Sequence, residues 1–117
     1  DIVITIGGAS VGLYDLVYDA ALKVGAKFEF TQVNIKPGKP FKAGKIGNTI
    51  IFSLPGNAVS SLICSQLFIG PLLEKLRGSD EQLKLDDAYL LKDISRNAQR
   101  MNFMSAQTSL KHDPLFQ

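Results

Sequence analysis

Four short apolar runs in the first half of the chain have the length and composition of β-strands. They cover residues 2–6, 27–33, 41–46 and 48–53. The first is continuously apolar, which is typical of a central parallel strand covered on both faces. The second places Phe28 and Phe30 on one face and Glu29 on the other, so we expect it nearer a sheet edge. The last two flank Gly47-Asn48, a pair that predicts a tight hairpin turn.

Two helices are predicted among these strands. Apolar residues recur at helical spacing over residues 14–24, and Gly25 is a suitable C-terminal stop. A longer helix begins at Asn57, a good N-terminal cap, and runs to about residue 77. We expect a kink in it at Gly70-Pro71, because proline removes a backbone hydrogen bond and clashes with the preceding turn. This order of strands and helices predicts an α/β fold.

The composition changes at Ser79. A polar, acidic stretch covers residues 79–87 and has the character of a linker. Beyond it, residues 88–94 and 101–110 have the pattern of two antiparallel strands around a turn at 96–98. A segment of about thirty residues is too short to close a hydrophobic core alone.

The sequence therefore predicts two parts. Residues 1–78 would be the C-terminal part of an α/β domain, and residues 79–117 a linker with the opening strands of a β-rich domain. Asp1 directly precedes an apolar run of the central-strand type, and central strands seldom begin a natural chain. We therefore also expect the sequence to be a piece of a longer polypeptide.

The composition excludes several classes of function. The 117 residues include 13 basic and 11 acidic ones, and a net charge of +2 with dispersed lysines is unlike a nucleic-acid-binding protein. No apolar run reaches the ~18 residues of a membrane span, so no membrane partner is expected either. Cys64 is the single cysteine and has apolar neighbours, which indicates a buried thiol and fits a cytoplasmic protein. With His112 as the single histidine, no zinc cluster or Ser-His-Asp triad is predicted.

Three glycine- or proline-rich turns follow the predicted strands and carry the candidate chemistry. They are residues 7–15 (GGASVGLYD), 36–40 (KPGKP) and 54–60 (LPGNAVS). A glycine turn between a strand and a helix N-terminus presents backbone N–H groups to an anion. The prolines of the second turn restrict its backbone, which lowers the entropic cost of holding Lys36 and Lys39 at an anionic ligand. Together the three turns predict a binding site for an anion.

Each turn also has a simpler explanation. The first departs from both the Walker A and the G-x-G-x-x-G patterns, and a tight strand-to-helix connection without a ligand would look the same. Asp15 can be explained as a helix-capping acid, and from residue type alone this is favoured over a metal ligand. The lysines of the second turn would also suit a solvated edge turn, and the third turn a well-capped helix.

Taken together, the three motifs resemble the molybdopterin molybdenumtransferase family, the MoeA and gephyrin E-domain type. The family pattern reads Gly-Gly-x-Ser-x-Gly-x-x-Asp, then Lys-Pro-Gly-Lys-Pro, then Leu-Pro-Gly-Asn-Pro-Val-Ser, and the match covers about residues 1–78. Residues 100–103 (RMNF) resemble the family's C-terminal β domain in their order along the chain. The resemblance implies a three-layer α/β/α domain of the molybdopterin-binding type, working within a homodimer whose active site lies between protomers.

The reaction that the resemblance implies is transfer of molybdate onto the dithiolene of adenylylated molybdopterin. AMP is released and the molybdenum cofactor is formed, with Mg²⁺ assisting. The adenylyltransferase of the same pathway is an implied partner. Carried over by position, Asp15 would be a catalytic acid and metal ligand, and Lys39 a catalytic cation. Binding of the pterin phosphate and of molybdate would fall to Gly8, Ser10, Gly12, Lys36, Pro55, Gly56, Asn57, Ser60 and Arg100.

Two departures from the family pattern bear on these expectations. Ala58 stands where the family usually has a second proline, which makes the third turn less rigid. The family's domain also begins before Asp1, with a Thr-Gly-Asp motif that contributes acidic groups to the site. The resemblance therefore implies that the isolated chain is catalytically inactive, and that an exposed sheet edge drives its self-association.

The sequence leaves three other functions open. Adenylyltransferases of the same fold, the MogA and MoaB type, activate molybdopterin with ATP. They usually carry Thr near the glycine turn, where this chain has Ser10, and they lack the appended β segment. A gephyrin-type scaffold that grips receptor peptides is a non-catalytic alternative that nothing in the sequence distinguishes. A generic nucleotide-binding domain explains the glycine turn but not the other two motifs.

Overall fold

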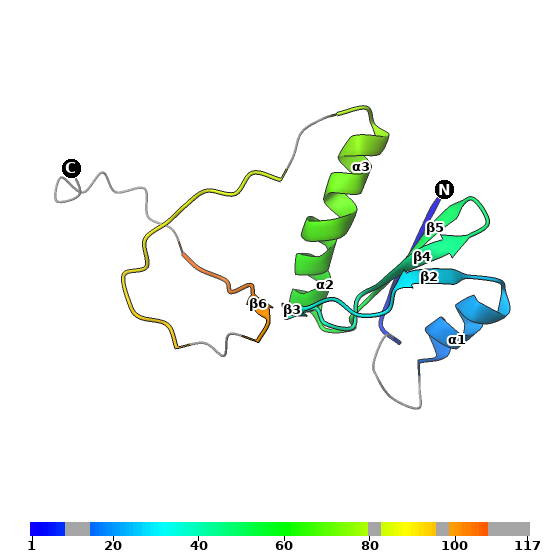
Figure 1. The fold of residues 1–117 in the computed structure, drawn as a ribbon, viewed down its shortest axis with the longest axis horizontal. Coiled ribbons are helices and arrows are strands. Elements are labelled where there is room, and N and C mark those ends of the chain that lie inside the picture. The colour runs from blue at the N-terminus through cyan, green and yellow to red at the C-terminus, as the bar shows by residue number, and fades with distance from the viewer. Residues whose placement is uncertain (9–14, 80–82, 96–98, 108–117) are drawn as a thin grey trace.

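The computed structural model describes residues 1–8, 15–79, 83–95 and 99–107 of the chain. Strands and helices occupy about the first two thirds of the chain, and a largely extended segment follows (Figure 1). The elements in chain order are β1 (Ile2–Ile6), α1 (Leu16–Lys23), β2 (Lys27–Phe30), β3 (Ile35–Lys36), β4 (Lys42–Ile46), β5 (Thr49–Leu54), α2 (Ala58–Cys64), the π-helical turn η1 (Ser65–Ile69), α3 (Gly70–Leu76) and β6 (Met101–Asn102). The predicted α/β class is confirmed.

The main sheet has the strand order β1-β5-β4-β2. β1 runs parallel to β5, with Thr5 opposite Ser53, while β4 is antiparallel to both of its neighbours. The predicted hairpin is confirmed, because β4 and β5 pair up to Ile46 opposite Thr49 on either side of Gly47-Asn48. β2 lies at a sheet edge as expected, but it ends at Phe30, where a register shift against β4 interrupts the pairing.

The first strand does not lie where its composition predicts. β1 forms the other edge of the sheet, and Val3, Ile4 and Ile6 are exposed. Within the described chain the expectation of a central strand covered on both faces therefore does not hold, whereas the exposed sheet edge that the resemblance implies is present. An apolar run shows that a strand prefers to be covered, but it cannot by itself supply the neighbouring strand. β5 has the central position instead, and Ile51 to Leu54 are buried along it.

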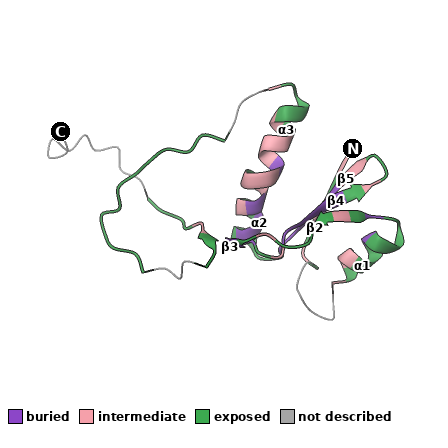
Figure 2. Cartoon of the chain, viewed as in Figure 1, coloured by how far each residue is buried: buried purple, intermediate pink, exposed green. Residues whose placement is uncertain are grey.

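Helices cover both faces of the sheet, which gives three layers (Figure 1). On one face Phe52 and Leu54 of β5 pack with Phe41, Cys64 and Ile69, and the last two of these come from α2 and η1. On the other face Ile51 packs with Ala21 of α1 and with Ala26, because successive side chains of a strand point to opposite faces. Burial is concentrated at β4, β5 and α2, while the segment after α3 is largely exposed (Figure 2).

The long second helix is interrupted just before the predicted kink. Asn57 caps α2 by accepting a hydrogen bond from the Ser60 amide at 3.1 Å, as expected. The Gly70 N–H bonds back to the Ser65 carbonyl, five residues earlier, so η1 has the pattern of a π-helix. Pro71 has no amide hydrogen for the regular pattern, and the disturbance is taken up in the turn that precedes it.

In the part of the chain that the structure describes, the helical stretch of residues 58–76 is long and apolar enough to cross a membrane, by length and composition alone. No uninterrupted apolar run marks this stretch in the sequence, because its serines, Gly70 and Pro71 divide it into shorter runs. Core helices of soluble proteins pass the same test, and here Cys64 and Ile69 lie in the hydrophobic core against the sheet.

The C-terminal segment differs from the prediction. Residues 88–94 form no strand, and Tyr89 and Leu91 are exposed there. The described part of the predicted strand 101–110 contains only the two residues of β6, which pairs in parallel with β3 rather than antiparallel with residues 88–94. Two isolated strands would bury little apolar surface, whereas β3 offers a backbone already held against the domain. The predicted turn at 96–98 lies outside the described residues, and the division into two domains stays a prediction.

Candidate functional site

The carboxyl ends of the parallel strands β1 and β5 bring two of the three predicted turns together. The Gly7 amide donates to the Leu54 carbonyl at 3.0 Å, and a Cβ placed on Gly56 would lie 3.4 Å from the Gly7 Cα. Gly8 has a φ of +67°, and a Cβ there would lie 2.8 Å from Val17 of α1, so only glycine fits. Ligands of α/β proteins bind at this end of parallel strands. Ser10 and Gly12, which were predicted for the same turn, lie outside the described residues.

The turn after β5 is closed by its own hydrogen bonds. Asn57 Oδ1 accepts from both the amide and the hydroxyl of Ser60, at 3.1 and 3.2 Å. The Ser61 hydroxyl donates to the Pro55 carbonyl. Ser60 and Ser61 are buried, while Gly56 and Asn57 are exposed at the turn itself. The Ser60 hydroxyl therefore supports the turn here, and an anion could use it as a donor only after it leaves Asn57.

Asp15 is the N-cap of α1, and both oxygens of its carboxylate are engaged. Oδ1 accepts from the Tyr18 amide at 3.1 Å, which is the capping role that residue type alone favoured. Oδ2 lies 2.6 Å from the ammonium of Lys42, at the start of β4. The two side chains are only 13% and 7% exposed, and the Lys42 ammonium also lies 5.3 Å from the centre of the Tyr18 ring.

Lys42 is a site residue that the sequence pattern did not indicate. It follows the Lys36–Pro40 motif by two positions, but nothing in the local pattern distinguishes it from the other lysines. It reaches Asp15, 27 residues away, because β4 is antiparallel to β5 and therefore starts where β5 ends. The pair is thus a product of strand order.

A polar row crosses the sheet beneath this ion pair. Ser53 lies opposite Lys42 of β4 on one side and opposite Thr5 of β1 on the other. The Thr5 hydroxyl donates to the Phe52 carbonyl at 3.3 Å. Ser53 is fully buried, and its hydroxyl has no hydrogen-bond partner among the described residues. Buried hydroxyls usually have partners, so Ser53 marks this row as unusual for a sheet interior.

The loop with the Lys-Pro-Gly-Lys-Pro motif is fixed to the body of the domain. Gly38 has a φ of +119° and its carbonyl accepts from the Phe41 amide at 3.0 Å and from the Cys64 thiol at 3.7 Å. The Val33 amide donates to the Lys39 carbonyl at 3.0 Å, and the Lys36–Pro37 peptide bond is cis. Lys36 and Lys39 are both exposed. The loop is thus hydrogen-bonded at three points, and Lys36 and Lys39 lie on its exposed side.

Cys64 has the buried position that was predicted for it. Burial raises the pKa of the Cys64 thiol to about 11. Its side chain therefore stays protonated at neutral pH, and it supports the Gly38 loop as a small apolar group with one weak donor.

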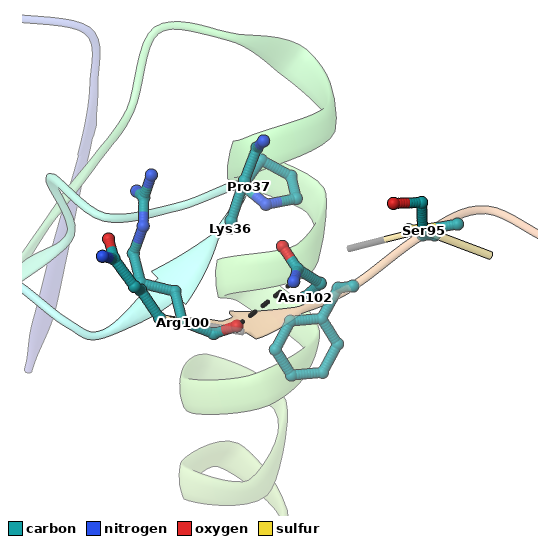
Figure 3. Close-up of a pocket in the computed structure, with 8 residues that line it drawn as sticks. Lys36, Pro37, Ser95, Arg100 and Asn102 are labelled. Carbon is teal, nitrogen blue, oxygen red and sulfur yellow. Dashed lines mark hydrogen bonds between the residues drawn. The ribbon is translucent and has the colours of Figure 1, made fainter. Parts of the chain in front are cut away.

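A cavity of about 320 Å³ lies where the β3–β6 pair meets the C-terminal segment. Lys36 and Arg100 both line it, with Asn102, Phe103 and Ser95 around them, and the side chains of Lys36 and Arg100 extend to the same side of the strand pair (Figure 3). Backbone bonds hold the two segments together, since Met101 donates to the Asn34 carbonyl at 3.2 Å and Phe103 to the Lys36 carbonyl at 2.8 Å.

The structure therefore sorts the predicted residues into two groups. Gly8, Asp15 and the turn from Pro55 to Ser60 gather at the carboxyl ends of β1 and β5. Lys36 and Arg100, 64 positions apart, share the cavity beside β3 and β6. Lys39 lies on the loop that connects β3 with β4, and it does not line the cavity. Asn102 also lines the cavity; it belongs to the RMNF segment, but the sequence analysis gave it no role.

Comparison with known proteins gives the family of this chain. The family described as "Probable molybdopterin binding domain" matches residues 1–75. A molybdopterin molybdenumtransferase of Haemophilus influenzae is 44% identical over 72% of the chain, and gephyrin of Dictyostelium discoideum is 40% identical over 67%. The molybdenum cofactor synthesis protein cinnamon of Drosophila melanogaster is 33% identical over 99% of the chain.

The chain spans only a small share of each of these relatives. It covers 20% of the Haemophilus and Drosophila proteins and 13% of the Dictyostelium protein. The family match nevertheless includes both strand-end turns, Asp15 and the lysine loop. The chain belongs to the molybdopterin-binding domain family, and its homology to parts of molybdopterin molybdenumtransferases and gephyrin connects it with molybdenum cofactor biosynthesis.

Proposed function

We propose that this chain forms part of a molybdopterin molybdenumtransferase, which inserts molybdate into adenylylated molybdopterin and releases AMP. One observation carries the proposal: Lys36 and Arg100 come from distant segments and line one cavity of about 320 Å³. Molybdate is a small tetrahedral dianion. A guanidinium provides directed N–H donors for oxygen atoms and an ammonium adds a point charge, so the two together suit such an anion.

In this proposal the two groups of residues have different tasks. Lys36 and Arg100 bind molybdate, with the Asn102 amide close by as a further polar group. Lys39, exposed on the same stiff loop, adds positive charge towards the anionic substrate. The turns after β1 and β5 bind the phosphate of the pterin through backbone N–H groups other than that of Gly7, which is donated to the Leu54 carbonyl.

Mg²⁺ enters the proposal from the resemblance, with Asp15 as its ligand. The described residues do not fit that role as they stand, because both oxygens of Asp15 already accept hydrogen bonds, from Tyr18 and Lys42. The same residues contain no group of three or more His, Cys, Asp or Glu side chains that could hold a metal ion. The mechanism therefore includes no step through a protein-held ion.

The wider setting is part of the proposal. We expect a cytoplasmic homodimer with the active site between protomers, supplied by the adenylyltransferase of the same pathway. Because the chain spans about a fifth of the molybdenumtransferases it matches, we expect the isolated 117-residue chain to be catalytically inactive.

The test is molybdate-dependent release of AMP from adenylylated molybdopterin by a whole molybdenumtransferase that carries this sequence. Lys36→Gln and Arg100→Gln should each lower kcat/KM at least about tenfold, since each removes a charged contact to the anion. Asp15→Ala and Lys39→Ala test the two catalytic assignments. Lys45→Gln, an exposed lysine on β4, is the matched control and should change nothing.

The outcomes separate the alternatives. Full activity in Lys36→Gln and Arg100→Gln would mean that the cavity is not the molybdate site. A parallel reaction with ATP and free molybdopterin tests adenylylation, and AMP transfer onto molybdopterin there would favour the adenylyltransferase. Absence of both reactions in a folded wild-type protein would favour a binding module or scaffold.

A further inference from the structure

The ion pair of Asp15 and Lys42 is the feature that the proposed reaction does not explain. The Lys42 ammonium lies 2.6 Å from Asp15 Oδ2, while the other carboxylate oxygen accepts from the Tyr18 amide at 3.1 Å. The carboxylate is thus held by one charged and one neutral donor. A side chain needed only to cap α1 would be satisfied by the Tyr18 amide alone.

The burial of the pair makes it more than a surface contact. The side chains of Lys42 and Asp15 are 7% and 13% exposed, whereas exposed ion pairs contribute little because water screens them. At low exposure each charge depends on its partner, and removing one leaves the other without compensation. The Lys42 ammonium also lies over the Tyr18 ring, 5.3 Å from its centre, and this contact further restricts its position.

The pair also lies at the place where the chain's anion-binding turns meet. Lys42 starts β4 beside the end of β5, opposite Ser53, and Asp15 precedes α1 on the same face of the sheet. This is the position for which the resemblance implies a divalent cation on Asp15. The observed occupant of that position is the ammonium.

We propose that the Lys42 ammonium takes the place of a divalent cation at Asp15, so that Lys42 orients this carboxylate and keeps metal ions off it. Lys42 is then a positioning residue for Asp15. The inference rests on the proposed function only in that Asp15 belongs to the site. A divalent ion that takes part in the reaction would arrive on the phosphates of the substrate, which is how Mg²⁺ commonly binds, rather than on this carboxylate.

The proposal makes a direct prediction about metal binding by the 117-residue chain. Mn²⁺, a paramagnetic substitute for Mg²⁺, is titrated into wild type, Lys42→Met and Lys42→Met/Asp15→Asn, and the free ion is measured by electron paramagnetic resonance. Lys42→Met should bind Mn²⁺ at least about tenfold more tightly than wild type, because a buried positive charge no longer repels the ion. The double variant should lose this gain.

Two control variants separate the charge from other effects of substitution. Lys42→Arg keeps a cation at Asp15 and should bind Mn²⁺ no more tightly than wild type. Lys45→Met removes an exposed lysine three residues along the same strand and should also match wild type. Equal Mn²⁺ affinity in wild type and Lys42→Met, or a gain that survives Asp15→Asn, would overturn the proposal.

A measurement on the wild type alone covers the case in which Lys42→Met fails to fold. In ¹H–¹⁵N spectra, Mn²⁺ broadens amide signals near its binding site. The Tyr18 amide, which is bonded to Asp15, should keep its line width at Mn²⁺ concentrations that broaden the amides beside exposed carboxylates such as Glu29. Selective broadening of Tyr18 would contradict the proposal. None of these experiments needs turnover, so their outcome is independent of whether the proposed reaction is correct.

Discussion

The backbone of Gly38 lies directly against the side chain of Cys64, and this contact ties the lysine loop to helix α2. A Cβ on Gly38 would come within 2.8 Å of both Cys64 Sγ and Ile35 Cδ1. The φ of Gly38 is +119°, a conformation that other residues rarely adopt. The position of Lys36 and Lys39 therefore depends on having glycine between them.

We expect Gly38→Ala to lower the free energy of unfolding by about 2–4 kcal/mol, from backbone strain and steric overlap together. Gly47→Ala is the matched control, because Gly47 has a φ of +56° but a Cβ placed on it would meet no atom within 4 Å. It should cost about 1 kcal/mol, from strain alone. Urea unfolding followed by circular dichroism measures both. Equal losses in the two variants would show that the close contacts with Cys64 and Ile35 contribute nothing.

Asn57 provides a second test, this time of the turn after β5. Its side chain caps α2 through Ser60, so Asn57→Ala should lower the free energy of unfolding by about 1 kcal/mol. Gln66→Ala, at an exposed position of the same helical stretch, should have little effect. The comparison is again made by urea unfolding, and an unchanged midpoint for Asn57→Ala would mean that the cap is not formed in solution.

The Cys64 thiol predicts a dependence of stability on pH. Burial raises its pKa from 9.0 to about 11, so the folded state disfavours the thiolate more than the unfolded state does. The stability that the folded state gains from the protonated Cys64 thiol is fully present below pH 9. It is lost as the pH rises from 9 towards 11, because ionisation of the thiol then stabilises the unfolded chain. Cys64→Ala lacks this titration. The stability gap between wild type and Cys64→Ala should therefore narrow over that range, and a constant gap in urea titrations at about pH 8 and about pH 10.5 would contradict the burial.

We expect the sheet to fold without the C-terminal segment, whereas the cavity needs this segment. A chain ending at residue 79 keeps the β1-β5-β4-β2 sheet and its helices, but it lacks Arg100, Asn102 and the strand β6 that pairs with β3. We expect it to retain its far-ultraviolet circular dichroism and to lose molybdate binding in calorimetry. A chain ending at residue 107 is the control. Equal affinity in the two chains would place the molybdate site elsewhere.

Local rules were sufficient for much of the fold. The two helices, the strands of the main sheet, the Gly47-Asn48 hairpin and the Asn57 cap each depend on residues within a few positions of one another, and each is confirmed. The stiffness of the lysine loop also follows from its own prolines and glycine. These features could be predicted because their physical causes lie within the segment itself.

The tertiary structure decided the features that need two distant segments. An apolar pattern could not show that β1 is an edge strand, since that depends on which strands lie beside it. It could not show that β6 pairs with β3 and so brings Arg100 beside Lys36. Nor could it show that Lys42 reaches Asp15, because that ion pair forms only when an antiparallel β4 begins at the carboxyl end of β5. The sequence determined the local elements and the candidate residues, and strand order determined which distant residues meet.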